Sequence, residues 1–362
     1  MNASSESTQF EGAKDSSPLL REQKTQHASP PLISIAMATF NGARHIEQQL
    51  KSILLQERLP DEMIIGDDGS TDRTIEILED FQAHAPFSVK IIRHQQRKGY
   101  ADNFLTTASQ CSGQWIMFCD QDDVWLPHKI AHVSQCISDH GDDDLMMVVQ
   151  SSELADEALR PSGRFLPKIR RIHGLPSGSH FGLWVVQGFC QTVRADLIRG
   201  FDWTRRPRGH TSHDQWTCML ANALGKVRYL PGRSALYRRH PSAETGNHLL
   251  ISFGSRAALR MRGAERYQLL ETAALEAGEC LRRLSISANS AELSHRLTAC
   301  ADRYQPLSSI FAARAALYES TSFVSALRAI ATVAKNGGYF GPQFVRLPPV
   351  SLLKDIARVF SI

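Results

Sequence analysis

Residues 115–127 read WIMFCDQDDVWLP, an apolar run of strand length followed at once by three aspartates in four positions. The apolar run is typical of a strand buried on both faces of a sheet. Neighbouring carboxylates raise one another's pKa unless a cation lies between them. The spacing of Asp120 and Asp122 therefore suits Mg²⁺ or Mn²⁺. The alternative is an acidic turn that begins the next helix, with Asp123 as its cap and Pro127 in its first turn.

Strand and helix patterns alternate through the first part of the chain. This alternation predicts right-handed βαβ units and a mostly parallel sheet, and thus an α/β fold. Open sheets of this class bind their ligands at the carboxyl ends of the strands, where the polar clusters of this sequence lie. The patterns predict strands at 32–38, 62–66, 88–93 and 115–119, and helices at 43–55, from 72 onward and at 102–111.

The pattern changes after about residue 155. Residues 160–182 are typical of a long loop, and helical periodicity dominates from residue 248. We expect strands at 183–186, 191–193, 226–230 and 234–236, and helices at 213–224, 267–284, 292–304, 310–335 and 351–360. The sequence thus predicts a disordered polar tail (1–31), an α/β domain (32–247) and a C-terminal helical region (248–362).

Composition narrows the class of protein. The chain has 41 Lys and Arg against 37 Asp and Glu, a balance that gives no electrostatic reason to expect nucleic-acid binding. Its seven cysteines are odd in number and show no CxxC spacing, which predicts buried, reduced thiols. The chain shows neither a signal-peptide pattern nor a long uncharged apolar run. We therefore expect a cytoplasmic protein.

The basic charge is concentrated at the end of the chain. Residues 250–362 contain 14 Lys and Arg against 8 Asp and Glu, whereas the rest of the chain is slightly acidic. The predicted helices at 310–335 and 351–360 combine this charge with an apolar face. Two interpretations follow: peripheral contact with the cytoplasmic face of the inner membrane, or packing against the α/β domain. The loop bases Lys168, Arg170, Arg171, Arg205, Arg206 and Arg208 could likewise contact acceptor phosphates or solvent.

Three further polar positions stand out. Asp67 follows the second strand, and its carboxylate is not required to cap the next helix, so it could accept a hydrogen bond from a nucleobase. Asp214 begins a predicted helix and is either a cap or a general base. His240 follows the strand at 234–236 and is either structural or a ligand of metal or phosphate.

Taken in order, these segments resemble the inverting family 2 glycosyltransferases of GT-A fold, and most of all the bacterial rhamnosyltransferase-like branch, which builds O-antigen and other surface polysaccharides. The resemblance runs from about Ile33 to Gly246. Its motifs are Ala38–Gly42, Asp67–Asp72, Lys98–Phe104, Phe118–Pro127 and His213–Trp216.

The resemblance implies a role for each matching residue. Thr39 and Asn41 would line the nucleotide pocket, and Asp67 would contact the base. Lys98 and Asn103 would border this pocket, and Asp120 would lie against the ribose. Asp122 would hold the divalent metal, with His240 near the diphosphate, and Asp214 would be the catalytic base.

The resemblance also implies a reaction. A single sugar, with rhamnose among the candidates, would pass from a dTDP- or UDP-linked donor to a lipid-linked or cell-surface glycan, with Mg²⁺ or Mn²⁺ as cofactor. The Gln-x-x-Arg-Trp motif of processive members is missing, which favours addition of one sugar. The alternatives are a non-catalytic nucleotide-sugar-binding assembly subunit and a nucleotidyltransferase, whose glycine-rich phosphate loop residues 39–44 match poorly.

Overall fold

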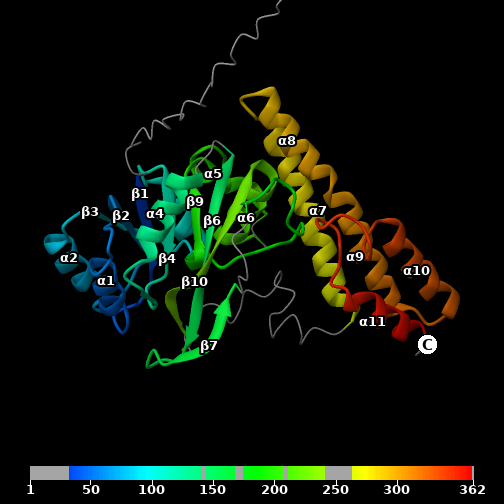
Figure 1. Cartoon of the computed structure of the whole chain (residues 1–362), viewed down its shortest axis with the longest axis horizontal. Coiled ribbons are helices and arrows are strands. Elements are labelled where there is room, and N and C mark those ends of the chain that lie inside the picture. The colour runs from blue at the N-terminus through cyan, green and yellow to red at the C-terminus, as the bar shows by residue number, and fades with distance from the viewer. Residues whose placement is uncertain (1–31, 141–143, 168–173, 208–210, 241–262, 361–362) are drawn as a thin grey trace, which may run out of the picture.

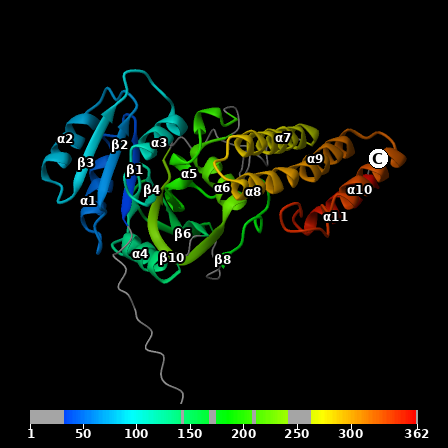
Figure 2. The same ribbon diagram turned by 90° about the horizontal axis from the view of Figure 1, so that it is seen from above.

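The computed structural model describes residues 32–140, 144–167, 174–207, 211–240 and 263–360 (Figure 1). An α/β part is followed by a set of long helices at its side (Figures 1 and 2). The expected tail at 1–31 and the expected boundary near 247 lie outside the described residues, as do Lys168, Arg170, Arg171 and Arg208.

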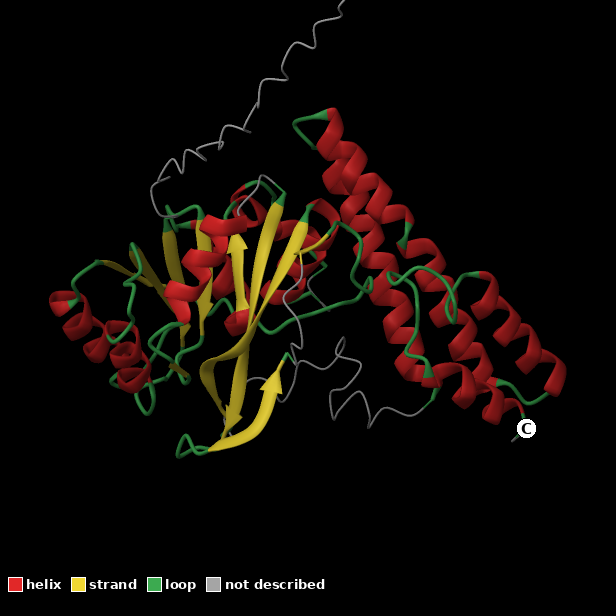
Figure 3. Ribbon diagram, in the orientation of Figure 1, coloured by secondary structure: helices red, strands yellow, loops and turns green. Residues whose placement is uncertain are grey.

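A single twisted sheet forms the centre of the α/β part (Figure 3). Its order is β3 (Ser88–Arg93), β2 (Glu62–Asp67), β1 (Ile33–Thr39), β4 (Trp115–Cys119), β9 (Gln191–Arg194), β6 (Leu145–Ala155), β10 (Lys226–Arg238) and β5 (Val124–Trp125). The first four strands are parallel to one another, and β6 is parallel to β10. The short strand β9 lies antiparallel between β4 and β6. Two strands extend the edges, β7 (Pro161–Leu166) on β6 and β8 (Gly174–Leu175) on β10.

Helices cover both faces of this sheet because its central strands are apolar on both sides. In β1, Ile33, Ile35 and Met37 belong to one apolar cluster and Ala36 to the other, as the alternation of a strand requires. The first cluster includes side chains of α1 (Ile46–Leu54), α2 (Thr74–His84) and α4 (Lys129–His140). The second includes those of α3 (Tyr100–Ser109), α5 (Asp196–Arg199) and α6 (His213–Leu224). Two short 3₁₀ helices, η1 (Gly188–Cys190) and η2 (Trp203–Arg205), precede β9 and α6.

The mostly parallel α/β fold is confirmed, and several local expectations are wrong. Strand β6 was not expected, because its second half is polar. Those polar residues are buried and hydrogen-bonded instead: Gln150 Nε2 donates to the Lys129 carbonyl at 3.1 Å, and Ser151 Oγ to the Pro167 carbonyl at 2.8 Å. The expected loop at 160–182 contains β7 and β8, whereas the expected strand at 183–186 is a turn and extended chain.

The C-terminal region is helical, as predicted. It contains α7 (Ala264–Ile286), α8 (Ala291–Asp302), α9 (Tyr304–Glu319), α10 (Phe323–Lys335) and α11 (Val350–Val359). The single helix expected at 310–335 is broken, because the Ser322 side chain accepts from the Ser325 N–H and starts a new helix. Among the described residues no helix is long and apolar enough to cross a membrane. All seven cysteines are free and buried, as expected.

The helices α7 to α9 share an apolar core with α6 of the α/β part. Polar contacts fix the junction: Tyr304 Oη donates to the Gly182 carbonyl at 2.7 Å, and the Gly182 N–H donates to the Phe344 carbonyl at 2.8 Å. Gly182 has room only for hydrogen, since a Cβ there would lie 2.6 Å from Leu307. The two parts therefore pack as one core, and α6 is braced from behind.

A buried ion pair attaches α11 to α9. Arg314 Nη2 lies 2.6 Å from Asp355 Oδ1, and Tyr339 Oη donates to the other carboxylate oxygen at 2.8 Å. The Arg314 guanidinium also lies 4.4 Å from the centre of the Tyr267 ring. Both ionised groups are almost fully buried, so the pair is costly to break from one side.

We expect Asp355→Ala to lower the free energy of unfolding by about 3–5 kcal/mol, because it leaves the Arg314 charge buried without its carboxylate. Asp302→Ala is the matched control, since the Arg282–Asp302 pair is half-exposed and such pairs contribute about 1 kcal/mol or less. Urea unfolding of the three proteins measures both effects. An equally small loss for the two variants would contradict the prediction.

Candidate functional site

The expected site residues follow the parallel strands, whose carboxyl ends meet at one edge of the sheet. Thr39 ends β1, Asp67 ends β2, and Asp120 follows β4 directly. Thr39 and Asp67 are paired in register between neighbouring strands. This edge therefore collects residues that are far apart in the sequence.

Asp67 organises its own loop. Its Oδ2 accepts from Thr39 Oγ1 at 2.9 Å, and its Oδ1 accepts the N–H groups of Gly69 and Ser70 at 3.1 and 2.9 Å. Only 2% of Asp67 is exposed. Thr39 and Asp67 thus form a buried pair beneath the loop, and the base contact expected for Asp67 stays a prediction.

The next residue, Asp68, was not singled out in the sequence. It is buried, and its two oxygens accept the N–H groups of Lys98 and Gly99 at 2.6 and 2.8 Å. It holds the start of α3 and leaves the Lys98 side chain exposed at the edge. Asn103, by contrast, is buried and donates to the Gly66 carbonyl at 2.8 Å, so it supports β2 from within.

Gln121 joins the acidic turn to the loop after β1. Its side chain accepts from the Phe40 N–H at 2.9 Å and donates to the Phe40 carbonyl at 3.1 Å. Gly42 has room for this contact, because a Cβ there would lie 2.2 Å from Gln121 Oε1. Asn41 lies beside it with a positive φ of 48°, exposed, and its Oδ1 accepts from the Thr71 N–H at 2.8 Å.

Asp122 and His240 contact each other beside the paired strands β5 and β10. Asp122 Oδ2 lies 2.8 Å from His240 Nε2, although 118 positions separate the two residues. The ring of His45, at the start of α1, lies 5.0 Å from the His240 ring, measured between centroids. Burial and the neighbouring Arg238 and His240 lower the pKa of His45. The structure thus brings together the two residues expected at the metal and adds a second histidine.

Arg238 braces this corner. Its Nε donates to the Asp122 carbonyl at 2.7 Å, its backbone N–H to Asp123 Oδ1 at 3.0 Å, and Nη2 to Gln48 at 2.6 Å. Asp123 therefore binds β10 and not the helix, and the expectation that it caps the helix is wrong. Helix α4 begins only at Lys129.

The carboxylates crowd one another. Desolvation and the charges of Asp122 and Asp214 raise the pKa of Asp120 to about 8. Burial and the charges of Asp122 and Asp120 raise the pKa of Asp123. Asp214 is thus close enough to act on Asp120, and the two chain segments share one electrostatic environment.

This crowding fits a divalent cation, which would offset the repulsion. Asp122 and His240 would offer it an oxygen and a nitrogen ligand. No group of three or more His, Cys, Asp or Glu in the described ranges is arranged to hold a metal alone. A cation here would need further oxygen ligands, which a diphosphate carries.

Asp214 lies in the first turn of α6 and is not its cap. Ser212 is the N-cap, and its N–H is bound in return by Gln215 Oε1 at 2.9 Å. Asp214 Oδ1 accepts from Ser212 Oγ and from the Gln215 N–H. The preceding loop is fixed by the buried Arg206, which pairs with Asp102 of α3. The half-buried Asp214 carboxylate is therefore held through its Oδ1 at the start of the helix, although Ser212 is the N-cap.

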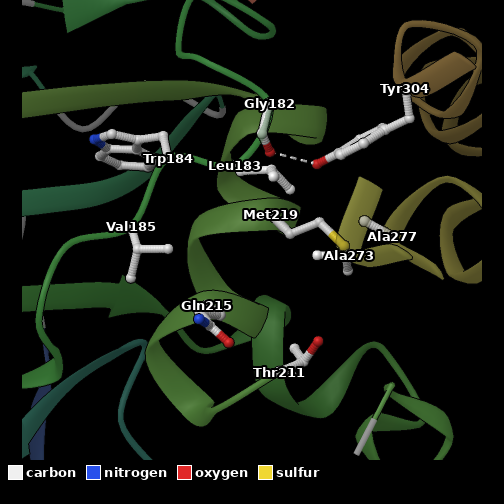
Figure 4. Close-up of a pocket in the computed structure, with 10 residues that line it drawn as sticks. All are labelled: Gly182, Leu183, Trp184, Val185, Thr211, Gln215, Met219, Ala273, Ala277 and Tyr304. Carbon is white, nitrogen blue, oxygen red and sulfur yellow. Dashed lines mark hydrogen bonds between the residues drawn. The ribbon is translucent and has the colours of Figure 1, made fainter. Parts of the chain in front are cut away.

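A small pocket lies between α6, α7 and the segment 182–185 (Figure 4). Gln215 and Met219 of α6, the segment 182–185, and Ala273 and Ala277 of α7 line it. The helical region thus forms one wall of a hollow beside the residue that follows Asp214.

Comparison with known proteins agrees with this geometry. Residues 34–201 match the sequence family described as glycosyl transferase family 2. Residues 34–201 are thus similar in sequence to glycosyltransferase family 2.

Two curated relatives illustrate this likeness. The dTDP-rhamnosyl transferase RfbG of Shigella flexneri is 38% identical over 105 residues, which are 28% of this chain and 36% of RfbG. The UDP-Glc:alpha-D-GlcNAc-diphosphoundecaprenol beta-1,3-glucosyltransferase WfgD of Escherichia coli is 31% identical over 100 residues, 27% of this chain and 38% of WfgD. The aligned segment thus spans little more than a third of either relative.

A solved structure supports the fold. The crystal structure of S. aureus TarS matches 84% of this chain and 53% of TarS, with a TM-score of 0.52 and 16% identity. The expected GT-A architecture is confirmed.

The family resemblance did not point to four residues at the site: His45, Asp68, Gln121 and Arg238. Asp68 and Gln121 stand inside the motifs, but their contacts with residues 98–99 and 40 are set by loop geometry. Arg238 reaches Asp122 and Asp123 only because β10 pairs with β5. No local signal in the sequence distinguishes His45.

His213, next to Asp214, is a buried histidine in an aromatic cage. Its ring lies 4.2 Å from Phe104 and 4.9 Å from Phe118 between centroids, and neither of its nitrogens has a hydrogen-bond partner. Burial lowers the pKa of His213 to about 4. Between pH 6.5 and 4 the unfolded chain thus binds a proton here that the folded chain does not, so stability falls as the pH drops through this window.

We expect His213→Leu to remove this dependence. Between pH 6.5 and 5, the free energy of unfolding of this variant should fall by about 2 kcal/mol less than that of the unmodified chain. The control is His84→Gln, at an exposed histidine, which should leave the pH dependence as it is. Urea unfolding at several pH values measures it, and parallel curves for His213→Leu and the unmodified chain would refute it.

Proposed function

We propose that this protein is an inverting, divalent-metal-dependent glycosyltransferase that adds one sugar from a nucleoside-diphosphate-sugar to a lipid-linked or cell-surface glycan. One observation carries the proposal: Asp122 Oδ2 and His240 Nε2, 118 positions apart in the sequence, meet at 2.8 Å where the polar turn follows β4. Similarity to family 2 supports the same reaction class.

The donor would lie along the carboxyl ends of β1, β2 and β4. We assign Thr39, Asn41 and Asp67 to the nucleotide side, bordered by Lys98 and Asn103, and Asp120 to the ribose. Because Thr39, Asp67 and Asn103 are buried and hydrogen-bonded within the protein, they would shape the loops that surround the nucleotide. The exposed Lys98 side chain would approach it from solvent, whereas the exposed Asn41 would approach it with its Oδ1 already bound to the Thr71 N–H.

The reaction is a single displacement. The acceptor oxygen bonds to C1 of the donor sugar while the bond from C1 to the phosphate oxygen breaks, and its electron pair leaves with the nucleoside diphosphate. Asp214 takes the proton of the acceptor hydroxyl, which suits a carboxylate held at a helix start without a capping role. A Mg²⁺ or Mn²⁺ ion held by Asp122 and His240 would stabilise the charge of the leaving diphosphate.

The names of the relatives guide the choice of substrates. RfbG is named for dTDP-rhamnose transfer and WfgD for transfer from UDP-glucose to a diphosphoundecaprenol-linked sugar. We therefore propose a dTDP- or UDP-linked donor, with rhamnose as the first sugar to test, and a lipid-diphosphate-linked acceptor of the kind used in surface polysaccharide synthesis.

We expect Asp214→Asn to lower the rate of sugar transfer by about 10²–10⁴-fold while donor affinity stays within about twofold, since only proton removal is lost. Asp196→Asn is the control, because Asp196 is likewise an acid in the first turn of a helix but pairs with Arg194 elsewhere. Nucleoside-diphosphate release reports the rate and calorimetry the affinity. Donor binding without any release in the unmodified chain would favour the assembly-subunit alternative.

We expect Asp122→Asn to weaken donor binding in Mn²⁺ at least about tenfold and to abolish the difference between Mn²⁺ and EDTA, because the carboxylate charge is lost. Asp156→Asn, at an exposed acid after β6 that binds Arg160, should behave as the unmodified chain. Titration calorimetry with dTDP- and UDP-sugars measures both. Donor affinity that is the same in EDTA and Mn²⁺ for all three proteins would refute the metal role.

A further inference from the structure

Helices α10 and α11 each present an apolar stripe to solvent on the side opposite to their packing face. In α10, Ala326, Ala329 and Val333 are buried, whereas Phe323, Val324 and Leu327 are exposed. In α11, Ser351, Asp355 and Val359 face inward and the outward positions recur every three or four residues. We call the outward set the α10–α11 face: Phe323, Val324, Leu327, Val350, Leu353, Ile356 and Phe360.

The two stripes form one surface. The rings of Phe323, at the start of α10, and Phe360, after the end of α11, lie 6.3 Å apart between centroids. Leu353 is 69% exposed and Phe360 79% exposed, both at positions where a helix of a monomeric protein normally carries polar residues. Contiguous apolar surface of this kind marks an interaction site.

The face is held in a fixed orientation. The buried Arg314–Asp355 pair and the bond from Tyr339 Oη turn one side of α11 inward, toward α9. The exposed stripe is therefore not the side by which α11 packs on the protein, because the inner side of the helix already makes those contacts. Both helices are too short to cross a bilayer, which leaves a surface contact.

The segment that carries the face exposes charge of one sign, although the exposed Glu319 of α9 precedes it directly. Residues 320–360 contain five cations: Arg328, Lys335, Arg346, Lys354 and Arg358. Their single acid is Asp355, which is fully buried against Arg314. Every ionised group that this segment exposes is thus positive. Lysine and arginine at the rim of an apolar helix face are the pattern of helices that lie in the interface of an anionic membrane.

Helix α11 lies on the same side of the molecule as the site. In Figure 1, α11 lies toward the lower edge, the edge toward which the parallel strands β1, β4, β6 and β10 run and at which the site lies. The hairpin between α7 and α8 lies at the opposite, upper edge.

From these observations, we propose that the α10–α11 face docks on the surface of an anionic phospholipid bilayer. The apolar stripe enters the boundary between headgroups and acyl chains, and the cations contact the lipid phosphates. The inference rests on the proposed function in one respect: a lipid-linked acceptor would lie in the same surface.

Vesicle sedimentation of the full chain tests the proposal. We expect binding to vesicles of phosphatidylglycerol and phosphatidylcholine, at least tenfold weaker binding to phosphatidylcholine alone, and weakening in 0.5 M salt. Leu353→Asp should reduce binding at least tenfold, and Lys354→Glu should weaken binding to the anionic vesicles alone. Ile286→Asp is the matched control, at an 87% exposed residue at the α7–α8 hairpin, and should bind as the unmodified chain.

Two outcomes would overturn the proposal. One is equal vesicle binding by Leu353→Asp, Ile286→Asp and the unmodified chain. The other is no binding by the unmodified chain, including the case in which light scattering finds a dimer that Leu353→Asp dissociates, which would make the face a contact between copies. Donor hydrolysis without vesicles separates this result from the proposed function: it should be unchanged in Leu353→Asp and lost in Asp214→Asn.

Discussion

The mutual repulsion of the aspartates after β4 is the constraint around which the α/β part is organised. Three carboxylates in four positions, together with burial, disfavour the ionised states of Asp120 and Asp123. The turn keeps its shape because groups from two other segments hold it. Gln121 ties it to the loop after β1, Arg238 ties it to β10, and His240 meets Asp122 from the end of the same strand.

These contacts couple the two edges of the site. The loop after β1 and the acidic turn cannot move independently, because the Phe40–Gln121 pair of hydrogen bonds joins their backbones. Likewise, the buried Arg206–Asp102 pair joins the loop before Asp214 to the first turn of α3, whose start Asp68 also holds. Most of the buried polar groups thus shape the site, while the residues with exposed polar atoms are left to meet a ligand.

The C-terminal helices connect the site at the sheet edge with a second surface of the molecule. They share the core of α6, so they support the helix that carries Asp214. Their outer end, at α10 and α11, is fixed by a buried ion pair and presents an apolar and positively charged surface. One continuous body therefore connects a charged site at the sheet edge with a surface suited to a bilayer, which fits a reaction whose acceptor is held in a membrane.

The sequence by itself determined the α/β class, the four parallel strands from β3 to β4 and the acidic turn, because continuous apolar runs and the polar clusters behind them are local signals. It also carried the motifs that resemble the family, and thereby Asp122, His240 and Asp214 as candidates. It did not show β6, since the buried polar residues of its second half are paired only with distant chain segments. The sequence could not show whether Asp214 is the cap of its helix, because the capping role of Ser212 depends on where the helix actually begins. Only the tertiary structure decided which residues surround the acidic turn: Arg238 and His45 come from strands and helices whose positions follow from sheet order, not from their neighbours in sequence. The same holds for the α10–α11 face, because an amphipathic pattern does not tell which side of a helix is buried when both sides carry apolar residues.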